Sequence, residues 1–177
     1  MRKHTYCILL SVLSILLGYA ELDARSVIDI NKDWSIYPAY NFSEIRKTPV
    51  DLPHSWNVED VKTGKMNYDR STYIYEKNLH IGSELKDQRL FLFFEGVNSV
   101  ANIFVNGKTV GEHYGGYTAF CLEITDYVIF GNENKIQVYV SNAFRLDVLP
   151  LIGDFNVYGG IHRPVSLVAT DKNCITP

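Results

Sequence analysis

The residues with catalytic potential in this 177-residue chain form no familiar catalytic motif. The sequence has no Gly-x-Ser-x-Gly nucleophile elbow, no His-Glu-x-x-His metal motif and no glycine-rich phosphate loop ahead of a helical pattern. The histidines are scattered rather than spaced as metal ligands, at His4, His54, His80, His113 and His162. We therefore expect no metal and no other cofactor, and no complete catalytic centre within this sequence.

One acidic side chain, Asp154, lies in the segment GDFNVYGG at residues 153–160. The residues alone favour an aspartate that only closes a turn after Gly153. The alternative is a binding role, because a carboxylate can accept two hydroxyl hydrogen bonds at once and charge-assisted hydrogen bonds are stronger than neutral ones. Asn156 and Tyr158 of the same segment are then candidate binding residues beside it.

The amino-terminal residues have the layout of a secretory signal peptide. Arg2 and Lys3 form a basic start, Cys7–Leu17 is apolar, and small residues follow up to Ala20. The apolar run is shorter than the ~20 residues that span a bilayer. We expect residues 1–20 to be removed, by cleavage after Ala20 or Ala24, and residues 21–177 to be secreted or periplasmic without a membrane anchor.

The remaining composition is that of one globular domain with a substantial core. Loss of Arg2 and Lys3 lowers Lys+Arg from 17 to 15 against 20 acidic residues, a net charge of −5. This excess of acid argues against a nucleic-acid partner. Cys121 and Cys174 permit one disulfide, but Cys121 falls in a strand pattern where a buried free thiol is ordinary, so we favour free cysteines.

Short alternating segments separated by turn residues predict an all-β fold. The clearest is a hairpin in which Asn106–Gly107 joins strands Val100–Val105 and Lys108–His113, because both turn residues tolerate positive φ. Polar Glu59–Arg70 is expected as a loop, and no helical stripe is evident. Further strands are expected at Val27–Ile30, Trp34–Tyr37, Ser71–Ile81, Arg89–Glu95, Ala119–Ile124, Lys135–Val140 and Pro164–Thr170.

Three motifs carry a resemblance to a known family. They are DLPHSWN at residues 51–57, FEGVNSVANIFVNGKTVGEHYGGYTAF at 94–120 and DFNVYGGIHRPVSL at 154–167. In this order they resemble the N-terminal jelly-roll domain of glycoside hydrolase family 2, the family of β-galactosidases, β-glucuronidases and β-mannosidases. The resemblance covers roughly residues 34–171 and implies a jelly-roll, galactose-binding-domain-like β-sandwich, most similar to that of a β-galactosidase.

The resemblance also implies roles for individual residues. Asp154 would lie at the lip of the catalytic pocket and contact hydroxyl groups of a β-linked glycoside, with Asn156 and Tyr158 on the same loop. Arg163 is expected to be a buried or interfacial guanidinium that ties this loop to backbone carbonyls. His54 and Trp56 could stack on a sugar, but we favour a Trp56 that plugs the end of the core and a His54 that caps the loop.

Hydrolysis of glycosides needs two carboxyl groups, about 5–5.5 Å apart in retaining enzymes. In the family both come from a (β/α)₈ barrel that follows an immunoglobulin-like domain, and this sequence contains neither. The acidic residues present are expected to be solvated strand or turn residues, at Asp69, Glu76, Glu95 and Asp126. The sequence therefore predicts a sugar-binding domain that is inactive by itself; the alternatives are a free-standing carbohydrate-binding module with an aromatic platform (Trp56, Tyr114, Tyr117, Tyr158) and a non-functional fragment.

Overall fold

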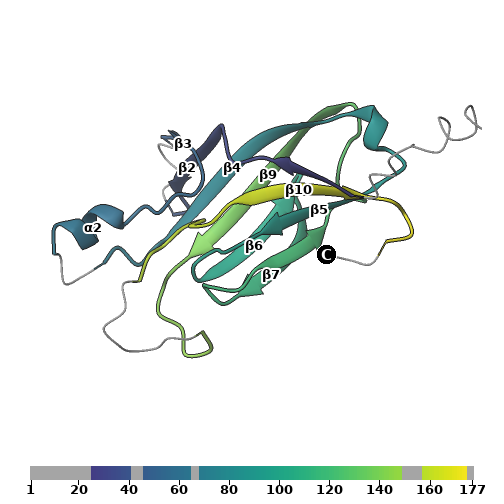
Figure 1. Ribbon diagram of the computed structural model, residues 1–177. Coiled ribbons are helices and arrows are strands. Elements are labelled where there is room, and N and C mark those ends of the chain that lie inside the picture. Colours follow the sequence, from purple (N-terminus) through teal and green to yellow (C-terminus); the bar gives the residue numbers. More distant parts are fainter. Residues whose placement is uncertain (1–24, 41–45, 65–67, 149–156, 175–177) are drawn as a thin grey trace, which may run out of the picture.

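The computed structural model describes residues 25–40, 46–64, 68–148 and 157–174, which form a sandwich of two antiparallel sheets (Figure 1). The smaller sheet has the order β1-β10-β5-β8, with bounds Arg25–Asp29, Val165–Thr170, Arg89–Phe94 and Phe120–Glu123. The larger has the order β3-β2-β4-β9-β6-β7, with bounds Thr48–Val50, Trp34–Pro38, Thr72–Ile81, Asn132–Ser141, Val100–Val105 and Lys108–Tyr114. The predicted β-sandwich is confirmed, and the predicted strand ends are off by only a few residues.

The core lies between the two sheets, because alternate side chains of each strand point inward. From β5, Leu90, Leu92 and Phe94 enter the core, and Phe94 stacks on Phe120 of β8 with ring centroids 4.8 Å apart. The larger sheet contributes buried side chains from four of its strands, among them Trp34, Tyr75, Ile103 and Val138. The alternation read in the sequence thus separates the inner face from the outer face.

The predicted hairpin at Asn106–Gly107 is confirmed. Both residues have positive φ, 51° and 78°, and β6 and β7 pair on either side of them. The Asn106 side chain also fixes the turn to the neighbouring strand: its Nδ2 donates to Asn134 Oδ1 at 2.8 Å, and its Oδ1 accepts from the Lys135 amide at 3.0 Å. The turn residue therefore aligns β6 with β9 as well as with β7.

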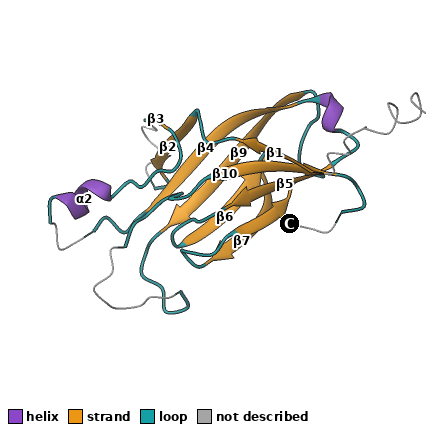
Figure 2. Ribbon diagram, viewed as in Figure 1, coloured by secondary structure: helices purple, strands orange, loops and turns teal. Residues whose placement is uncertain are grey.

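Two short helices lie at opposite ends of the sandwich (Figure 2), and the sequence pattern predicted neither. Helix α2, Val58–Lys62, occupies part of the expected loop Glu59–Arg70. Its first turn carries Glu59 and Asp60 and its last turn Lys62, which suits the helix dipole. The second is a 3₁₀ turn, η1, at Ser83–Leu85.

Glu76 corrects the expectation of a solvated carboxylate, because its side chain is buried on the outer face of the larger sheet. It accepts hydrogen bonds from Lys47 Nζ at 2.5 Å, Tyr37 Oη at 2.9 Å and Gln137 Nε2 at 3.0 Å. Burial by itself raises the pKa of Glu76, but these three donors outweigh burial and hold the pKa below its ordinary value. The charged network fastens the segment before β3 to the sheet.

Both described cysteines are free, as favoured from the sequence. Cys121 of β8 pairs with Phe93, whereas Cys174 Sγ lies against Thr170 Oγ1 at 2.9 Å and Arg89 Nη1 at 3.6 Å. Phe93 and Arg89 are four residues apart along β5, or roughly 13 Å, well beyond the ~7 Å limit between Cα atoms for a disulfide. Within the described ranges, no helix is long and apolar enough to span a membrane.

Shortening a hydrophobic side chain should lower the free energy of unfolding substantially only where that side chain is buried. Ile103→Ala, at a fully buried position of β6, should lower the free energy of unfolding by about 2–5 kcal/mol, through lost burial and the cavity left behind. Ile129→Ala is the matched control, because that isoleucine is 55% exposed and its loss should change stability by under about 0.5 kcal/mol. Urea denaturation of both variants checks this, and equal losses would contradict the described packing.

Candidate functional site

Several loops meet at the end of the sandwich where β4 begins and β9 ends, the end that carries α2 (Figure 1). We call this the loop end. Its described segments are residues 52–58, 69–71, 96–99, 114–117, 141–148 and 157–163. The last of these is the carboxyl-terminal part of the motif that contains Asp154, so the described part of that motif lies at the loop end.

The motif segment is held by backbone pairing with the segment that contains His54 and Trp56. The His54 amide donates to Ile161 O at 2.8 Å, and the Trp56 amide donates to Gly159 O at 3.1 Å. Ser55 Oγ adds a third bond, also to Gly159 O, at 3.0 Å. Residues roughly a hundred positions apart in the sequence are thus fixed side by side, and the motif has one defined position on the sandwich.

Three buried asparagine side chains complete this attachment. Asn57 Nδ2 donates to Val157 O at 2.8 Å, and Asn57 Oδ1 accepts from the Gly159 amide at 2.9 Å. On the other side Asn98 Nδ2 donates to Tyr158 O at 2.5 Å. Asn142 Nδ2 donates to Val157 O at 3.3 Å and to Asp69 O at 3.0 Å. Because a carboxamide both donates and accepts, each of these residues can join two loops.

Gly159 and Gly160 make this close approach possible. A Cβ at Gly159 would lie 2.1 Å from the indole of Trp56, and one at Gly160 would lie 2.4 Å from His54 O. Gly160 also has φ +142°, a conformation that residues with a side chain rarely adopt. Glycine at position 159 is therefore favoured by contact with the neighbouring loop, and at position 160 by both contact and backbone conformation.

Trp56 and His54 serve the supporting role that we favoured over sugar stacking. Trp56 packs on the edge of the core, its ring 4.7 Å from that of Tyr73, and its Nε1 donates to Asp69 O at 3.3 Å. His54 Nδ1 lies 2.8 Å from Tyr75 Oη, and the Tyr75 side chain is completely buried. The indole of Trp56 is in contact with Tyr73 and lies close to Gly159, so it is engaged within the loop end.

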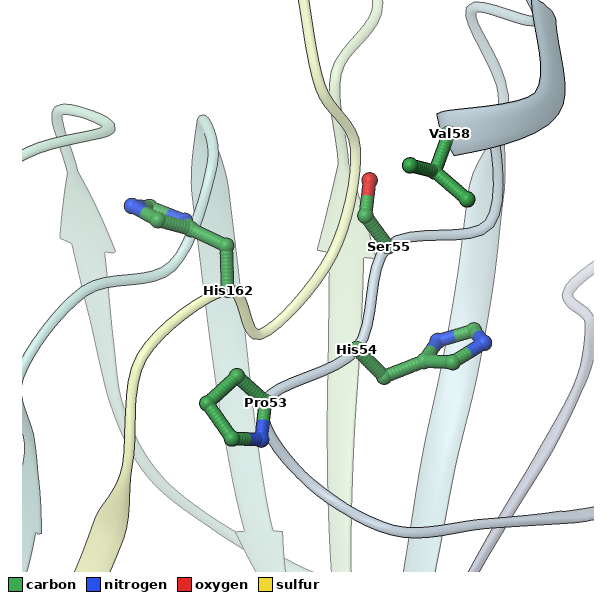
Figure 3. Close-up of a pocket in the computed structure, with 5 residues that line it drawn as sticks. All are labelled: Pro53, His54, Ser55, Val58 and His162. Atoms are coloured by element: carbon green, nitrogen blue, oxygen red, sulfur yellow. The ribbon is translucent and has the colours of Figure 1, made fainter. Parts of the chain in front are cut away.

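A shallow cavity of about 400 Å³ opens at the loop end, lined by Pro53, His54, Ser55, Val58 and His162 (Figure 3). The two imidazole rings point to opposite sides in this view. Both ring nitrogens of His162 are buried without a hydrogen-bond partner in the described part of the chain, and the ring meets Tyr117 edge-on at 5.9 Å. Burial lowers the pKa of His54 and His162, and Arg163 lowers that of His162 further, so both rings are held neutral.

Of the predicted binding residues, only Tyr158 can be placed. Asp154 and Asn156 lie outside the described residues, and their roles stay predictions. Tyr158 is half-buried, with its carbonyl bound by Asn98. Arg163 is exposed in this domain, so the expectation of a buried guanidinium is wrong, whereas the alternative of an interfacial guanidinium stays a prediction. Its Cδ lies so close to Gly96 that a Cβ there would be 2.9 Å away.

The sequence did not reveal the three asparagines as loop anchors, because each follows or interrupts a strand and could equally be a solvated turn residue. Two of the acidic residues considered from the sequence are engaged within the described domain: the Asp69 carboxylate accepts hydrogen bonds from Ser71 Oγ and Tyr73 Oη, and Glu76 accepts one from Lys47 Nζ. No group of three or more potential metal ligands occurs among the residues that the structure describes. What the loop end offers is a rigid support for a motif loop.

A β-sandwich whose loop end displays this motif is a sugar-binding domain of a glycosidase. The chain belongs to glycoside hydrolase family 2, since its residues 19–171 match the domain described as "Glycosyl hydrolases family 2, sugar binding domain".

Two sequence relatives and one solved structure illustrate the match. The chain is 48% identical over 153 residues to a β-glucuronidase of Bacteroides fragilis, covering 86% of this chain and 22% of that protein. It is 35% identical over 153 residues to a β-galactosidase of Thermoanaerobacter pseudethanolicus, covering 81% and 21%. The crystal structure of a Bacteroides uniformis β-glucuronidase superposes with a TM-score of 0.76 at 34% identity, covering 83% and 18%. This chain thus spans about one fifth of the length of these relatives.

Gly160→Ala should destabilise the loop end more than an alanine at another glycine of positive φ. The added methyl group would overlap His54 O and Tyr75 Oη. We expect the free energy of unfolding to fall by about 2–4 kcal/mol, because of strain and broken hydrogen bonds. Gly107→Ala is the control, because φ there is +78° with nothing within 4 Å, and about 1 kcal/mol should be lost. Thermal unfolding compares the two, and equal losses would show that the contact with His54 is not tight.

Acidification should destabilise the fold before the carboxylates titrate. Burial depresses the pKa of His54, His113 and His162 in the folded state, so the unfolded chain binds protons first. Stability is then complete above the unfolded histidine pKa, about 6.5, and falls as the pH drops from about 7 towards 5. Urea denaturation at several pH values between about 5 and 7 measures how the free energy of unfolding depends on pH. His162→Gln should reduce this dependence of stability on pH, because it removes one of the three imidazoles with a depressed pKa, and an unchanged dependence would contradict the role of that ring.

Proposed function

We propose that this domain supplies part of the sugar subsite of a family 2 glycosidase, through the loop that carries Asp154. The observation behind the proposal is the rigid attachment of residues 157–161 by Asn57, Asn98 and Asn142. The attached residues begin three positions after Asp154. A carboxylate that binds sugar hydroxyl groups can select a sugar, because a hydroxyl group missing from the ligand leaves its partner unpaired. Asn156 and Tyr158 would assist Asp154 from the same loop.

The hydrolytic step itself is assigned to domains beyond this sandwich. Glycoside hydrolysis needs two suitably spaced carboxyl groups, and the expected candidates Asp69 and Glu76 are engaged in hydrogen bonds within the sandwich. The relatives are about five times as long as the region they share with this chain, which leaves room for a separate catalytic domain. We therefore propose that the domain acts with an immunoglobulin-like domain and a (β/α)₈ barrel, and that it does not hydrolyse glycosides alone.

The sugar is proposed to be a β-glucuronide or a β-galactoside. The motif resemblance led us to a β-galactosidase type, whereas the B. fragilis β-glucuronidase shares 48% identity and the T. pseudethanolicus β-galactosidase 35%. The higher identity favours a glucuronide. From the apolar run at Cys7–Leu17 we also propose export to the periplasm or the exterior.

A free-standing carbohydrate-binding module is the second candidate. It is favoured by the exposure of Tyr114 and Tyr117, which are 44% and 51% accessible at the loop end. It is weakened by Trp56, whose ring already packs against Tyr73 and lies close to Gly159. Calorimetry of the isolated chain with glucuronate and galactose oligosaccharides separates the candidates, because only the module should bind without a catalytic domain.

A chimera tests the main proposal directly. Residues 25–177 would replace the matching fifth of the B. fragilis β-glucuronidase, and hydrolysis of aryl β-glucuronide and aryl β-galactoside would be measured. We expect activity on one of them, and Asp154→Ala should lower kcat/KM about 10- to 100-fold through lost charge-assisted hydrogen bonds.

The control in this chimera is Asp171→Ala, at an exposed position just after β10, which should leave kcat/KM unchanged. A folded chimera without activity on either substrate would refute the assignment to a glycosidase of these two types. Activity that is indifferent to Asp154→Ala would refute the role of that carboxylate.

A further inference from the structure

Strand β1 forms one edge of the smaller sheet. Among the strands that the structure describes it has a single hydrogen-bonded neighbour, β10, with a continuous register from Arg25 opposite Thr170 to Asp29 opposite Ser166. Its apolar side chains are open to solvent, Val27 at 60% and the adjacent isoleucine at 41%. Because an edge strand offers backbone N–H and C=O groups to a further strand, an exposed apolar edge is a site for strand addition.

The other three edges of the two described sheets are protected against such pairing. β3 contains Pro49, which has no N–H to donate. The pairing of β7 with β6 is interrupted by a register shift between Ile103 and Phe104. β8 packs against β7, since a Cβ at Gly111 would lie 2.9 Å from Leu122 Cδ2. Strand β1 contains no proline, and its register with β10 has no shift.

The hydrogen bonds to β10 determine which backbone groups of β1 point outward. The Ile30 amide, directly after the strand, donates to Val165 O at 3.3 Å. Backbone groups alternate between the two sides of an antiparallel strand, so the other even-numbered residues of β1 also bond to β10. The N–H and C=O groups of the odd-numbered residues Arg25, Val27 and Asp29 therefore point to the free edge.

The side chains of these three odd-numbered residues are complementary to themselves. They lie on the outer face of the sheet, because Val27 pairs with Val168, whereas the adjacent Leu167 enters the core. An antiparallel second copy centred on Val27 would place Arg25 opposite Asp29 twice, once on each side of the centre. A parallel copy would bring like charges together. Opposite charges directly across a strand pair stabilise it, and like charges destabilise it.

We infer that β1 is a self-association edge, at which two copies of this chain pair antiparallel about a two-fold axis at Val27. The same patch then serves both copies, and the outward groups form roughly six hydrogen bonds. The pairing joins two four-stranded sheets into one continuous sheet. A shift to the next register that pairs odd-numbered residues would leave outward groups unpaired and separate the opposite charges. The inference goes beyond the proposed function and does not depend on it, since it uses no residue of the loop end.

Sedimentation equilibrium of this chain over a range of concentrations tests the inference. A five-residue strand pairing buries less than the ~800 Å² per partner of stable complexes, so we expect a weak dimer with a dissociation constant of roughly 10–500 μM. Val27→Pro removes an outward N–H and no hydrogen bond to β10, so it should abolish the dimer and leave the melting temperature unchanged. Val27→Thr is the matched control, because it keeps the N–H and a β-branched side chain, and its dissociation constant should change by less than about threefold.

Charge exchange tests the register. Arg25→Asp places like charges across both ends of the pairing and should raise the dissociation constant about tenfold or more. The double variant Arg25→Asp/Asp29→Arg restores opposite charges and should return the constant to within about threefold of the original. Asp29 also accepts a hydrogen bond from the Asn31 amide at 2.7 Å, so rescue is judged from the dissociation constant and not from stability.

Amide hydrogen exchange gives a second readout. Rising concentration should protect the amides of residues 25, 27 and 29, whereas those of residues 26 and 28, already bonded to β10, should change little. A chain that stays monomeric up to about 1 mM, or a dimer that persists in Val27→Pro, would overturn the inference. A dimer that is indifferent to Arg25→Asp, or that charge exchange does not restore, would overturn it as well.

Discussion

The close contact between Gly159–Gly160 and the His54–Trp56 segment is the constraint on which the loop end depends. Two stretches of backbone approach so closely that an added methyl group at either glycine would overlap its neighbour. The contact also joins the two sheets, because residues 54–56 follow β3 of the larger sheet whereas residues 159–161 lead into β10 of the smaller one. The same contact therefore sets the relative position of the sheets and of the motif loop.

Buried carboxamides make this contact specific. A purely apolar interface could close the end of the sandwich, but it would tolerate sliding, since hydrophobic contact has no direction. Asn57, Asn98 and Asn142 each bind particular carbonyl or amide groups of residues 157–160, and any shift would leave buried polar groups unpaired. The network converts a loop, usually the most variable part of a fold, into a rigid extension of the core.

The fold could be predicted well from the sequence because strand alternation and turn residues are local patterns. Alternation along β5 and the turn residues Asn106–Gly107 determine strand faces and register without reference to distant residues. Helix α2 was missed because one turn has too few residues to show a hydrophobic stripe, and Glu76 because its burial depends on Lys47 and Tyr37 from other elements. The roles of the asparagines likewise arise from pairings across about a hundred residues, and the predicted role of Asp154 rests on motif resemblance alone.

The described sandwich begins and ends on neighbouring strands of the smaller sheet. The first and last described strands, β1 and β10, are hydrogen-bonded neighbours, with Arg25 opposite Thr170. Entry to and exit from the sandwich therefore lie side by side, as in domains that tolerate insertion into another chain. A module of this kind can be added to the side of an enzyme without lengthening the path of the chain between its other domains, so its loops can change in sequence while the other domains stay unchanged.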